Sequence, residues 1–413
     1  MYSNHDRDIL RSLAEEVATI AASPEMAARR ERWTRHNDLD SPAPLLLVFP
    51  EGAWAELLPH TALSCEDDQA RHWEWDLRSR LYTHEHFHAD HVVEAEWVVH
   101  RAIRSTGWGL APRQRPAPSS RGAWAFDPVV STPADLDRLT TPQLSVDDAA
   151  TAAAVELAES TFGDLLTVRT VGLAHVSYHL YYQWTALRGL EQTYEDMVAD
   201  PEFLHAALRR LTDAHHDLRR QAEALGLYSP NNNNTYQATG GNGYTATLDP
   251  PATGPVPTQQ MWASAESQEL DPVSPAMHRE FALQYEAELL APWGLTGYGC
   301  CERLHNKLAD VCALSGMRRI SMSPFCDLPT AAAQVADRFI FSFKPQPSHL
   351  VGAFDERVVR EYLREALAVC RGTVLEMILK DTHTCDGRPE RFDRWTRICR
   401  EEIDAASPGW RGA

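Results

Sequence analysis

Short apolar runs alternate with amphipathic helical patterns along most of this chain, and this rhythm constrains the fold more than any other feature. Eight of the runs read as strands, and they cover residues 45–49, 95–99, 165–171, 226–228, 294–300, 319–323, 339–343 and 373–379. Between the later runs, amphipathic patterns predict helices over residues 275–291, 302–313, 329–336 and 355–370.

Strands that alternate with helices pair in parallel through right-handed crossovers. Eight such units close most simply into a (β/α)8 barrel. Residues 1–40 read as a helical extension, because apolar residues recur there at three- and four-residue steps. We therefore expect an α/β protein with a single TIM barrel over residues 41–405, interrupted by insertions at 101–130 and 228–260.

The composition limits the kinds of molecule that the protein can bind. The chain of 413 residues has a net charge of −19, which excludes a general nucleic-acid binder and argues against anionic membranes. The N-terminus shows no basic segment followed by an apolar stretch, so we expect a cytoplasmic protein that acts on a small molecule. Eight cysteines spread through so long a chain are expected to be free thiols there.

The insertion at 228–260 is rich in Asn, Gly, Thr and Pro and directly follows the fourth predicted strand. Long polar loops after barrel strands are where barrel enzymes hold their substrates. The predicted substrate-binding residues in this loop are Asn232, Asn233, Tyr236 and Tyr244. A flexible solvated loop is the alternative interpretation.

Two polar groups of residues follow predicted strands five and eight. Cys300 and Cys301 follow the fifth, and His383 and Cys385 follow the eighth. His383 and Cys385 are two residues apart, so in extended backbone both side chains point to the same side. Imidazole and thiolate ligands suit Zn²⁺, and three protein ligands leave the open position of a catalytic site. The alternative is that the His-x-Cys spacing is fortuitous and that the two adjacent cysteines are small core residues.

Other polar residues are candidates for proton transfer or substrate binding. Lys344 and Lys380 end predicted strands seven and eight, where each could pair with a substrate carboxylate or with a neighbouring acid. Glu266 is a candidate proton-transfer group, although a surface helix explains its spacing from Glu269 equally well. Glu302, directly after the two cysteines, is a further substrate-binding candidate.

At these motifs the sequence resembles the superfamily that joins uroporphyrinogen decarboxylases to zinc-dependent methylcobamide:thiol methyltransferases, and it is most similar to a poorly characterised branch. The resemblance is carried by residues 298–302, 305–307, 319–324, 341–345 and 380–385, with weaker support from residues 35–37 and 50–54. It implies a single barrel of the uroporphyrinogen decarboxylase type. For the methyltransferase side, it implies zinc held by a His-x-Cys pair and another cysteine. In this chain the single cysteine position comes first and His383-x-Cys385 last, the reverse of the family's order.

These observations favour a zinc-dependent methyl or alkyl transferase that activates a thiol-type acceptor. Its donor would be a corrinoid carried by a separate protein or a small methylated compound. A decarboxylase that acts on a carboxylated substrate through Lys344, Lys380 or Asp327 is the first alternative. A non-catalytic protein that delivers a corrinoid or a metal to another protein is the second.

Overall fold

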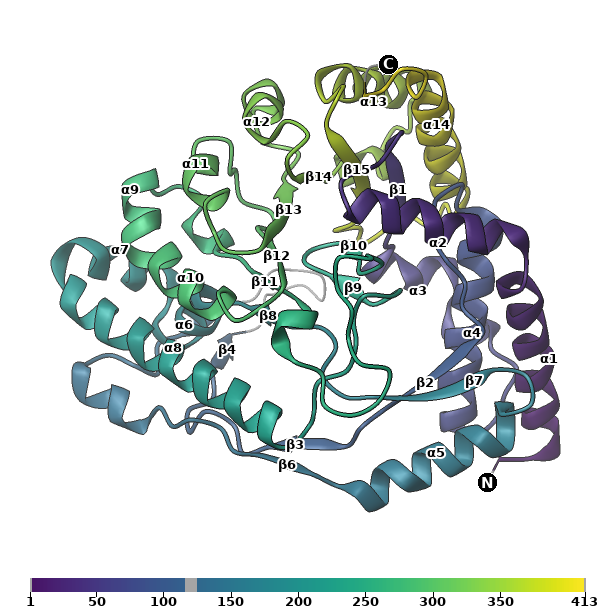
Figure 1. The fold of residues 1–413 in the computed structure, drawn as a ribbon, viewed down its shortest axis with the longest axis horizontal. Helices are drawn as coiled ribbons and strands as arrows, with labels where there is room; N and C mark the ends of the chain where they lie inside the picture. The colour runs from purple at the N-terminus through teal and green to yellow at the C-terminus, as the bar shows by residue number, and fades with distance from the viewer. Residues whose placement is uncertain (1, 116–124, 412–413) are drawn as a thin grey trace.

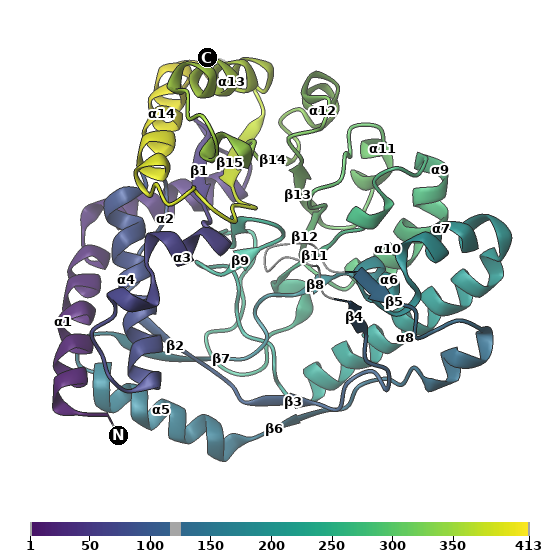
Figure 2. The same cartoon turned by 180° about the vertical axis from the view of Figure 1, so that it is seen from behind.

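The centre of the molecule is a seven-stranded parallel sheet, seen in a computed structural model that describes residues 2–115 and 125–411 (Figures 1 and 2). In spatial order its strands are β1 (Leu45–Val48), β15 (Val374–Leu379), β14 (Ile340–Phe343), β13 (Met317–Met322), β12 (Leu295–Tyr298), β11 (Trp262–Ala265) and β8 (Ser177–Tyr178). The strands of this sheet are almost entirely buried, as expected for parallel strands covered on both faces. The predicted α/β class is confirmed.

Helices follow the later strands, largely as the sequence predicts. The predictions over 275–291, 329–336 and 355–370 are confirmed. They correspond to α9 (Pro275–His278) with η6 (Arg279–Leu283) and α10 (Gln284–Leu290), α12 (Leu328–Val335) and α13 (Glu356–Val369). Of the predicted helix at 302–313, only the turn α11 (Leu308–Val311) forms. The preceding residues form a loop instead, because Arg303 pairs with Asp271 and the Lys307 ammonium donates to the Leu270 carbonyl at 2.7 Å.

Two predicted strands lie outside the main sheet. The runs at 95–99 and 165–171 form β2 (Glu96–His100) and β7 (Thr167–Val171), which pair with each other in parallel. The run at 226–228 forms no strand, and Tyr228 makes only a single bridge to Leu173. Strands β8 and β11 of the main sheet were not predicted from the sequence. The reason for β11 is its composition, because Trp262–Ala265 contains Ala and Ser rather than the β-branched residues typical of strands.

The sheet does not close into a ring among the described residues, so the predicted closed barrel of eight paired strands is not seen. Its edges are β1 and β8. At the β1 edge, side chains replace a neighbouring strand: the backbone N–H of Leu46 donates to Asp90 Oδ2 at 2.9 Å, and that of Val48 donates to His91 Nε2 at 3.0 Å. Such caps satisfy the edge N–H groups without a ladder.

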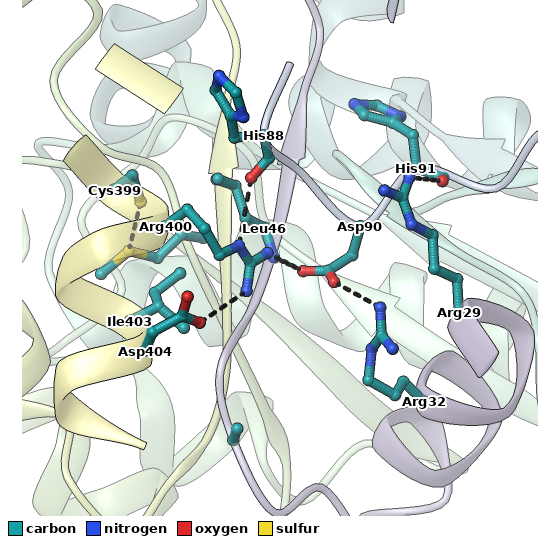
Figure 3. A network of polar contacts seen from close by, with 12 residues as sticks. Arg29, Arg32, Leu46, His88, Asp90, His91, Cys399, Arg400, Ile403 and Asp404 are labelled. Carbon is teal, nitrogen blue, oxygen red and sulfur yellow. Dashed lines mark hydrogen bonds and ion pairs between the residues drawn. The ribbon is translucent and has the colours of Figure 1, made fainter. Parts of the chain in front are cut away.

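Asp90 also connects this edge to two helices (Figure 3). Its carboxylate pairs with Arg400 of α14 (Glu390–Ala406) at 2.5 Å and with Arg32 of α2 (Pro24–Asn37) at 3.2 Å. Burial opposes the ionisation of Asp90, but Arg400 and the Leu46 N–H together keep its pKa below the ordinary value. The interrupted side of the sheet is therefore held by a buried, charged network.

The N-terminal helices are α1 (Asn4–Ala21) and α2, as the sequence predicts for this stretch. The proposed division of the chain at residue 40 stays a prediction. The other helices are α3 (Trp54–Leu57), α4 (Asp68–His86), α5 (Asp148–Phe162), α6 (Leu180–Arg188), α7 (Leu190–Ala199) and α8 (Pro201–Ala224). None of the helices in the described part of the chain is both long and apolar enough to span a membrane.

The insertions form small antiparallel pairs. Strands β3 (Ile103–Ser105) and β6 (Leu144–Val146) pair, as do β4 (Arg113–Arg115) and β5 (Ala125–Asp127). Part of the predicted insertion at 101–130, residues 116–124, lies outside the described residues. The second insertion holds β9 (Tyr236–Gln237) and β10 (Gly241–Asn242).

Much of this second insertion is buried against the sheet rather than solvated. Asn231 is fully buried and accepts from the Trp262 backbone N–H at 2.9 Å. A Cβ at Gly241 would lie 2.2 Å from Cζ of Arg319, a side chain of β13, so only glycine allows the backbone to pass there. The Asn/Gly-rich composition thus serves close packing over part of the loop.

Candidate active site

The carboxyl ends of parallel strands meet at one edge of a sheet, and polar residues follow several of them here. Cys300 comes two residues after β12, Lys344 directly follows β14, and Lys380 directly follows β15. Glu51 stands three residues beyond β1. We call this group, with Asp381 and Cys301, the rim cluster.

Lys380 is the cation of the rim cluster. Its ammonium lies 3.6 Å from Asp381 Oδ1 and 4.0 Å from Glu51 Oε1, and the residue is 9% exposed. Burial opposes its charge, but Tyr236, Cys300 and the two carboxylates together raise the pKa of Lys380 above its ordinary value. Lys380 therefore stays charged across the neutral range.

Both carboxylates beside Lys380 lie on strained backbone. Glu51 has a φ of 50° and Asp381 a φ of 58°, in the left-handed region that non-glycine residues seldom adopt. Such strain gathers at functional sites, where the surrounding structure holds it in place. The sequence analysis proposed neither residue as a site residue, although both follow strands whose ends it predicted.

The two adjacent cysteines differ in exposure but stay close together. Their Sγ atoms are 3.5 Å apart, and Cys301 Sγ lies 3.7 Å from Asp381 Oδ2. Cys301 is exposed, whereas Cys300 is partly buried. Contact with Cys301 and then burial raise the pKa of the Cys300 thiol. The rim cluster thus contains two thiols, of which Cys300 stays protonated at neutral pH.

Lys344 is a buried amine within the rim cluster. Its Nζ donates to Ser342 Oγ at 2.7 Å and to the Ser342 carbonyl at 3.2 Å. Burial lowers the pKa of Lys344 to about 7, and the charge of Lys380 acts in the same direction. A large fraction of this amine is therefore neutral near pH 7 and able to accept a proton.

Lysine is scarce in this chain, a signal that the sequence analysis did not use. Only three of the 39 lysine and arginine residues are lysines, at 307, 344 and 380. All three are at most 9% exposed. An amine shifts its pKa on burial, whereas a guanidinium stays charged. The rare lysines thus mark Lys344 and Lys380 as places where an amine, rather than a guanidinium, is needed.

Carboxylic acids gather on the other side of Cys300. Glu266 follows β11, and its Oε1 lies 2.6 Å from Nδ1 of His179, which follows β8. Glu302 accepts from the Cys300 backbone N–H at 2.8 Å, and burial followed by the charge of Glu266 raises its pKa to about 7. The same two causes raise the pKa of Glu269 to about 8. The sequence predicted Glu266 and Glu302 as site residues and missed His179.

The predicted zinc ligands occupy different surroundings. The Cys385 thiol is buried 3.1 Å from Oε2 of Glu56, and burial followed by this contact raises its pKa to about 11. His383 packs against Gly52, where a Cβ would lie 3.4 Å from its Nδ1. In the described ranges no three His, Cys, Asp or Glu side chains are grouped so as to hold a metal ion. The residues present do not form the predicted ligand set, and a zinc site stays a prediction.

Of the predicted loop residues, Tyr236 lies beside the rim cluster. Burial raises its pKa to about 12, and the charges of Lys380, Glu51 and Asp381 act on its hydroxyl. The other three make hydrogen bonds with the surrounding protein. The Asn232 amide donates to the Leu248 carbonyl at 3.2 Å, Asn233 Oδ1 accepts from the Thr235 N–H at 2.9 Å, and the Tyr244 hydroxyl donates to Glu94.

Comparisons with known proteins bear on the fold. No protein-family model matches the sequence, and no curated protein matches it. Among solved structures, the chain is similar to a methyltransferase from Methanosarcina mazei, with a TM-score of 0.50 and 11% sequence identity. The match covers 91% of this chain and 99% of the other. At this identity the likeness shows a shared α/β fold, while membership of the uroporphyrinogen decarboxylase superfamily stays a prediction.

Proposed function

We propose that this chain is a methyltransferase with its active site at the rim cluster. We also propose that its fold is an interrupted (β/α)8 barrel of the uroporphyrinogen decarboxylase type, in which the segment around Asp90 and His91 takes the place of a paired strand. The observation that carries the proposal is the convergence of Cys300, Lys344 and Lys380 at one sheet edge. The whole-length likeness to a methyltransferase supports it.

Methyl transfer to a thiol acceptor forms a sulfur–carbon bond, breaks the bond between the methyl group and its donor, and releases the acceptor's proton. In our proposal Lys344 takes that proton, because burial leaves much of its amine neutral near pH 7. Lys380 keeps its charge and holds an anionic group of the donor or the acceptor. Glu302 and the His179–Glu266 pair bind polar groups of the substrate on the other side of Cys300.

Zinc, the thiol acceptor and a corrinoid donor carried by a separate protein are the finer parts of this proposal. A bound zinc ion would lower the pKa of an acceptor thiol. No residue role given above depends on such an ion, since the predicted ligands do not gather among the described residues. Elemental analysis of the purified protein and of Cys385→Ala tests this part. If the wild-type protein contained no metal, the zinc part of the proposal would be excluded, and the proposal of methyl transfer would not be affected.

The transfer itself is tested with free methylcobalamin as donor and 2-mercaptoethanol as acceptor, followed by the absorbance change as the donor loses its methyl group. Lys344→Met should lower the rate at pH 7.5 by about 10²–10⁴-fold, the usual contribution of a positioned base. Arg357→Met, on the exposed face of α13, is the control and should leave the rate unchanged. Absence of thiol methylation by the wild-type protein between pH 6 and pH 9 would contradict the proposal.

A second candidate, decarboxylation, is favoured by the acids beside Cys300. Loss of CO₂ from a carboxylate leaves a carbanion, which takes up one proton. Lys380 is a permanent cation for the carboxylate, and the raised pKa values of Glu302 and Glu269 leave protonated acids at neutral pH. Release of CO₂ that resists chelators and falls in Glu302→Gln would favour this function over methyl transfer.

A further inference from the structure

A cavity lies at the interrupted side of the sheet, next to the rim cluster. Its volume is about 630 Å³, within the range of small-molecule sites. It is bounded by the end of β1, by α4, by the residues after Asp90, and by the β2–β7 pair. The gap between the two sheet edges therefore encloses a space large enough for a ligand.

The β2–β7 pair is built to face this cavity. Side chains alternate along a strand, and the cavity is lined by Glu96, Val98 and His100 of β2 and by Arg169 and Val171 of β7. The intervening residues Trp97 and Val99 point the other way and belong to the buried cluster that includes residues of α1 and α4. One face of the pair is thus structural, and the other forms a cavity wall.

The charged side chains on the cavity wall are all paired. Arg169 lies 3.0 Å from Glu96, Arg80 lies 2.6 Å from Asp76, and Glu94 pairs with Arg30 at 2.5 Å. Burial lowers the pKa of His91 to about 4, and His91 Nε2 accepts from the Val48 N–H, so this ring is neutral with its proton on Nδ1. Each Arg and Glu side chain that lines the cavity in the described part of the chain is therefore already paired with a side chain of opposite charge.

The wall nearest the rim cluster is aromatic. Phe49 packs edge-on against His91, with ring centroids 5.8 Å apart, and against Tyr236 at 5.2 Å. Tyr236 also contacts His175, which lines the cavity and whose Nδ1 lies 3.0 Å from the Tyr236 carbonyl. Tyr236 therefore contacts two lining residues, Phe49 and His175, while Lys380 acts on the pKa of its hydroxyl.

We propose that this cavity binds the neutral, planar aromatic part of a small molecule against Phe49. An offset or edge-on aromatic contact with this ring supplies affinity, and the paired charges disfavour ionic ligands. That this molecule is the substrate whose reactive end reaches the rim cluster rests on the proposed function. Its binding does not.

The test uses a matched set of probes with the purified full chain: 2-naphthol, the anion 2-naphthoate, a trimethylammonium derivative of naphthalene, and saturated decahydro-2-naphthol. Binding is measured by fluorescence titration for the aromatic probes and by ligand-observed NMR for all four. We expect 2-naphthol to bind at least about tenfold more tightly than the other three, a difference of about 1.4 kcal/mol. Failure of 2-naphthol to bind, or equal or tighter binding of any other probe, overturns the proposal.

Variants that fill the cavity with a larger side chain test whether 2-naphthol binds there. Thr83→Trp, on α4, and Val98→Trp, on β2, each place a larger side chain in the cavity wall and should each weaken 2-naphthol binding at least about tenfold. Thr19→Trp, on the exposed face of α1, makes the same kind of change away from the cavity and should bind as the wild type does. Unchanged affinity in both folded filling variants overturns the site. Binding without methyl transfer would count against the proposed function alone.

Discussion

The two halves of this chain use strand-like sequence in different ways. In the C-terminal half, strands β11 to β15 follow one another in the sheet in chain order, each joined to the next by a short helical connection. In the N-terminal half, β1 joins the far edge, whereas β2 and β7 pair with each other outside the sheet. When the connection between two strands is short, the second strand can pair only beside the first. A long insertion between them lets the second strand pair elsewhere.

The difference also separates the proposed roles of the two halves. We call the consecutive strands β11 to β15 of the C-terminal half the ladder. The ends of these strands place Cys300, Lys344 and Lys380 at one edge of the sheet. The interrupted half, where Asp90 and His91 cap β1, leaves the cavity. The comparison predicts that disrupting a buried pair in the ladder costs more stability than disrupting the caps.

The largest effect is expected at the buried pair of Arg319 and Glu376. Their closest atoms, Arg319 Nε and Glu376 Oε1, are 2.9 Å apart, and both residues are at most 1% exposed. Glu376→Gln leaves the guanidinium without its counter-charge, so we expect a loss of about 3–5 kcal/mol in the free energy of unfolding. Denaturant unfolding followed by circular dichroism measures it.

The control for this variant is Glu361→Gln, whose partner Arg357 lies 3.1 Å away on the exposed face of α13. An exposed pair of this kind contributes at most about 0.5 kcal/mol. If the two variants lost similar amounts of stability, the ladder would not depend on the buried pair.

A smaller loss is expected at the cap. Asp90→Asn removes the charge that pairs with Arg400 and Arg32 and weakens the acceptor for the Leu46 N–H, which should cost about 2 kcal/mol at pH 7. Because the pKa of Asp90 is lowered in the folded state, its charge contributes stability above the unfolded pKa of about 4 and loses it as the pH falls further.

The difference between wild type and Asp90→Asn should therefore narrow as the pH is lowered below about 4. Asp40→Asn, in an exposed pair with Arg35, is the matched control and should change little at any pH. A difference that stays constant from pH 7 to the acid range would mean that the charge of Asp90 contributes nothing to the edge.

The sequence predicted the ladder half well, for a physical reason. Predominantly apolar runs such as 339–343 and 373–379 are typical of strands buried on both faces, and the strand ends located Lys344 and Lys380. Composition was misleading where small residues form a buried strand, as in Trp262–Ala265. It was misleading again where polar residues pack inside, as at Asn231, because hydrogen bonding to the backbone satisfies a buried amide.

The candidate site could be predicted only in part, because contacts between residues far apart in the chain cannot be read from the sequence. Cys385 follows a predicted strand, but its thiol lies beside Glu56 of α3, a contact that no spacing in the sequence encodes. His179 follows the two-residue strand β8, which is too short to give a recognisable pattern. The scarcity of lysine, by contrast, was readable from the sequence and places Lys344 and Lys380 among only three lysines.

The smallest effect is expected at Lys344, and here the variant should gain stability. Burial lowers the folded pKa of Lys344 to about 7, below its unfolded value of about 10.4, so at pH 6 the folded state holds a buried charge at a cost. Lys344→Met removes that cost but also the hydrogen bond to Ser342, which leaves a net gain of about 1 kcal/mol at pH 6.

That gain should shrink as the pH rises above 7, because the wild-type amine loses its proton in the folded state first and wild-type stability increases up to about pH 10. NMR of protein labelled with ¹³C at lysine Cε measures the titration directly, since the chain has only three lysines. We expect the signal that is missing in Lys344→Met to titrate near pH 7. A midpoint above pH 9 would show that the amine remains charged, and it would remove Lys344 as the proton acceptor at the rim cluster.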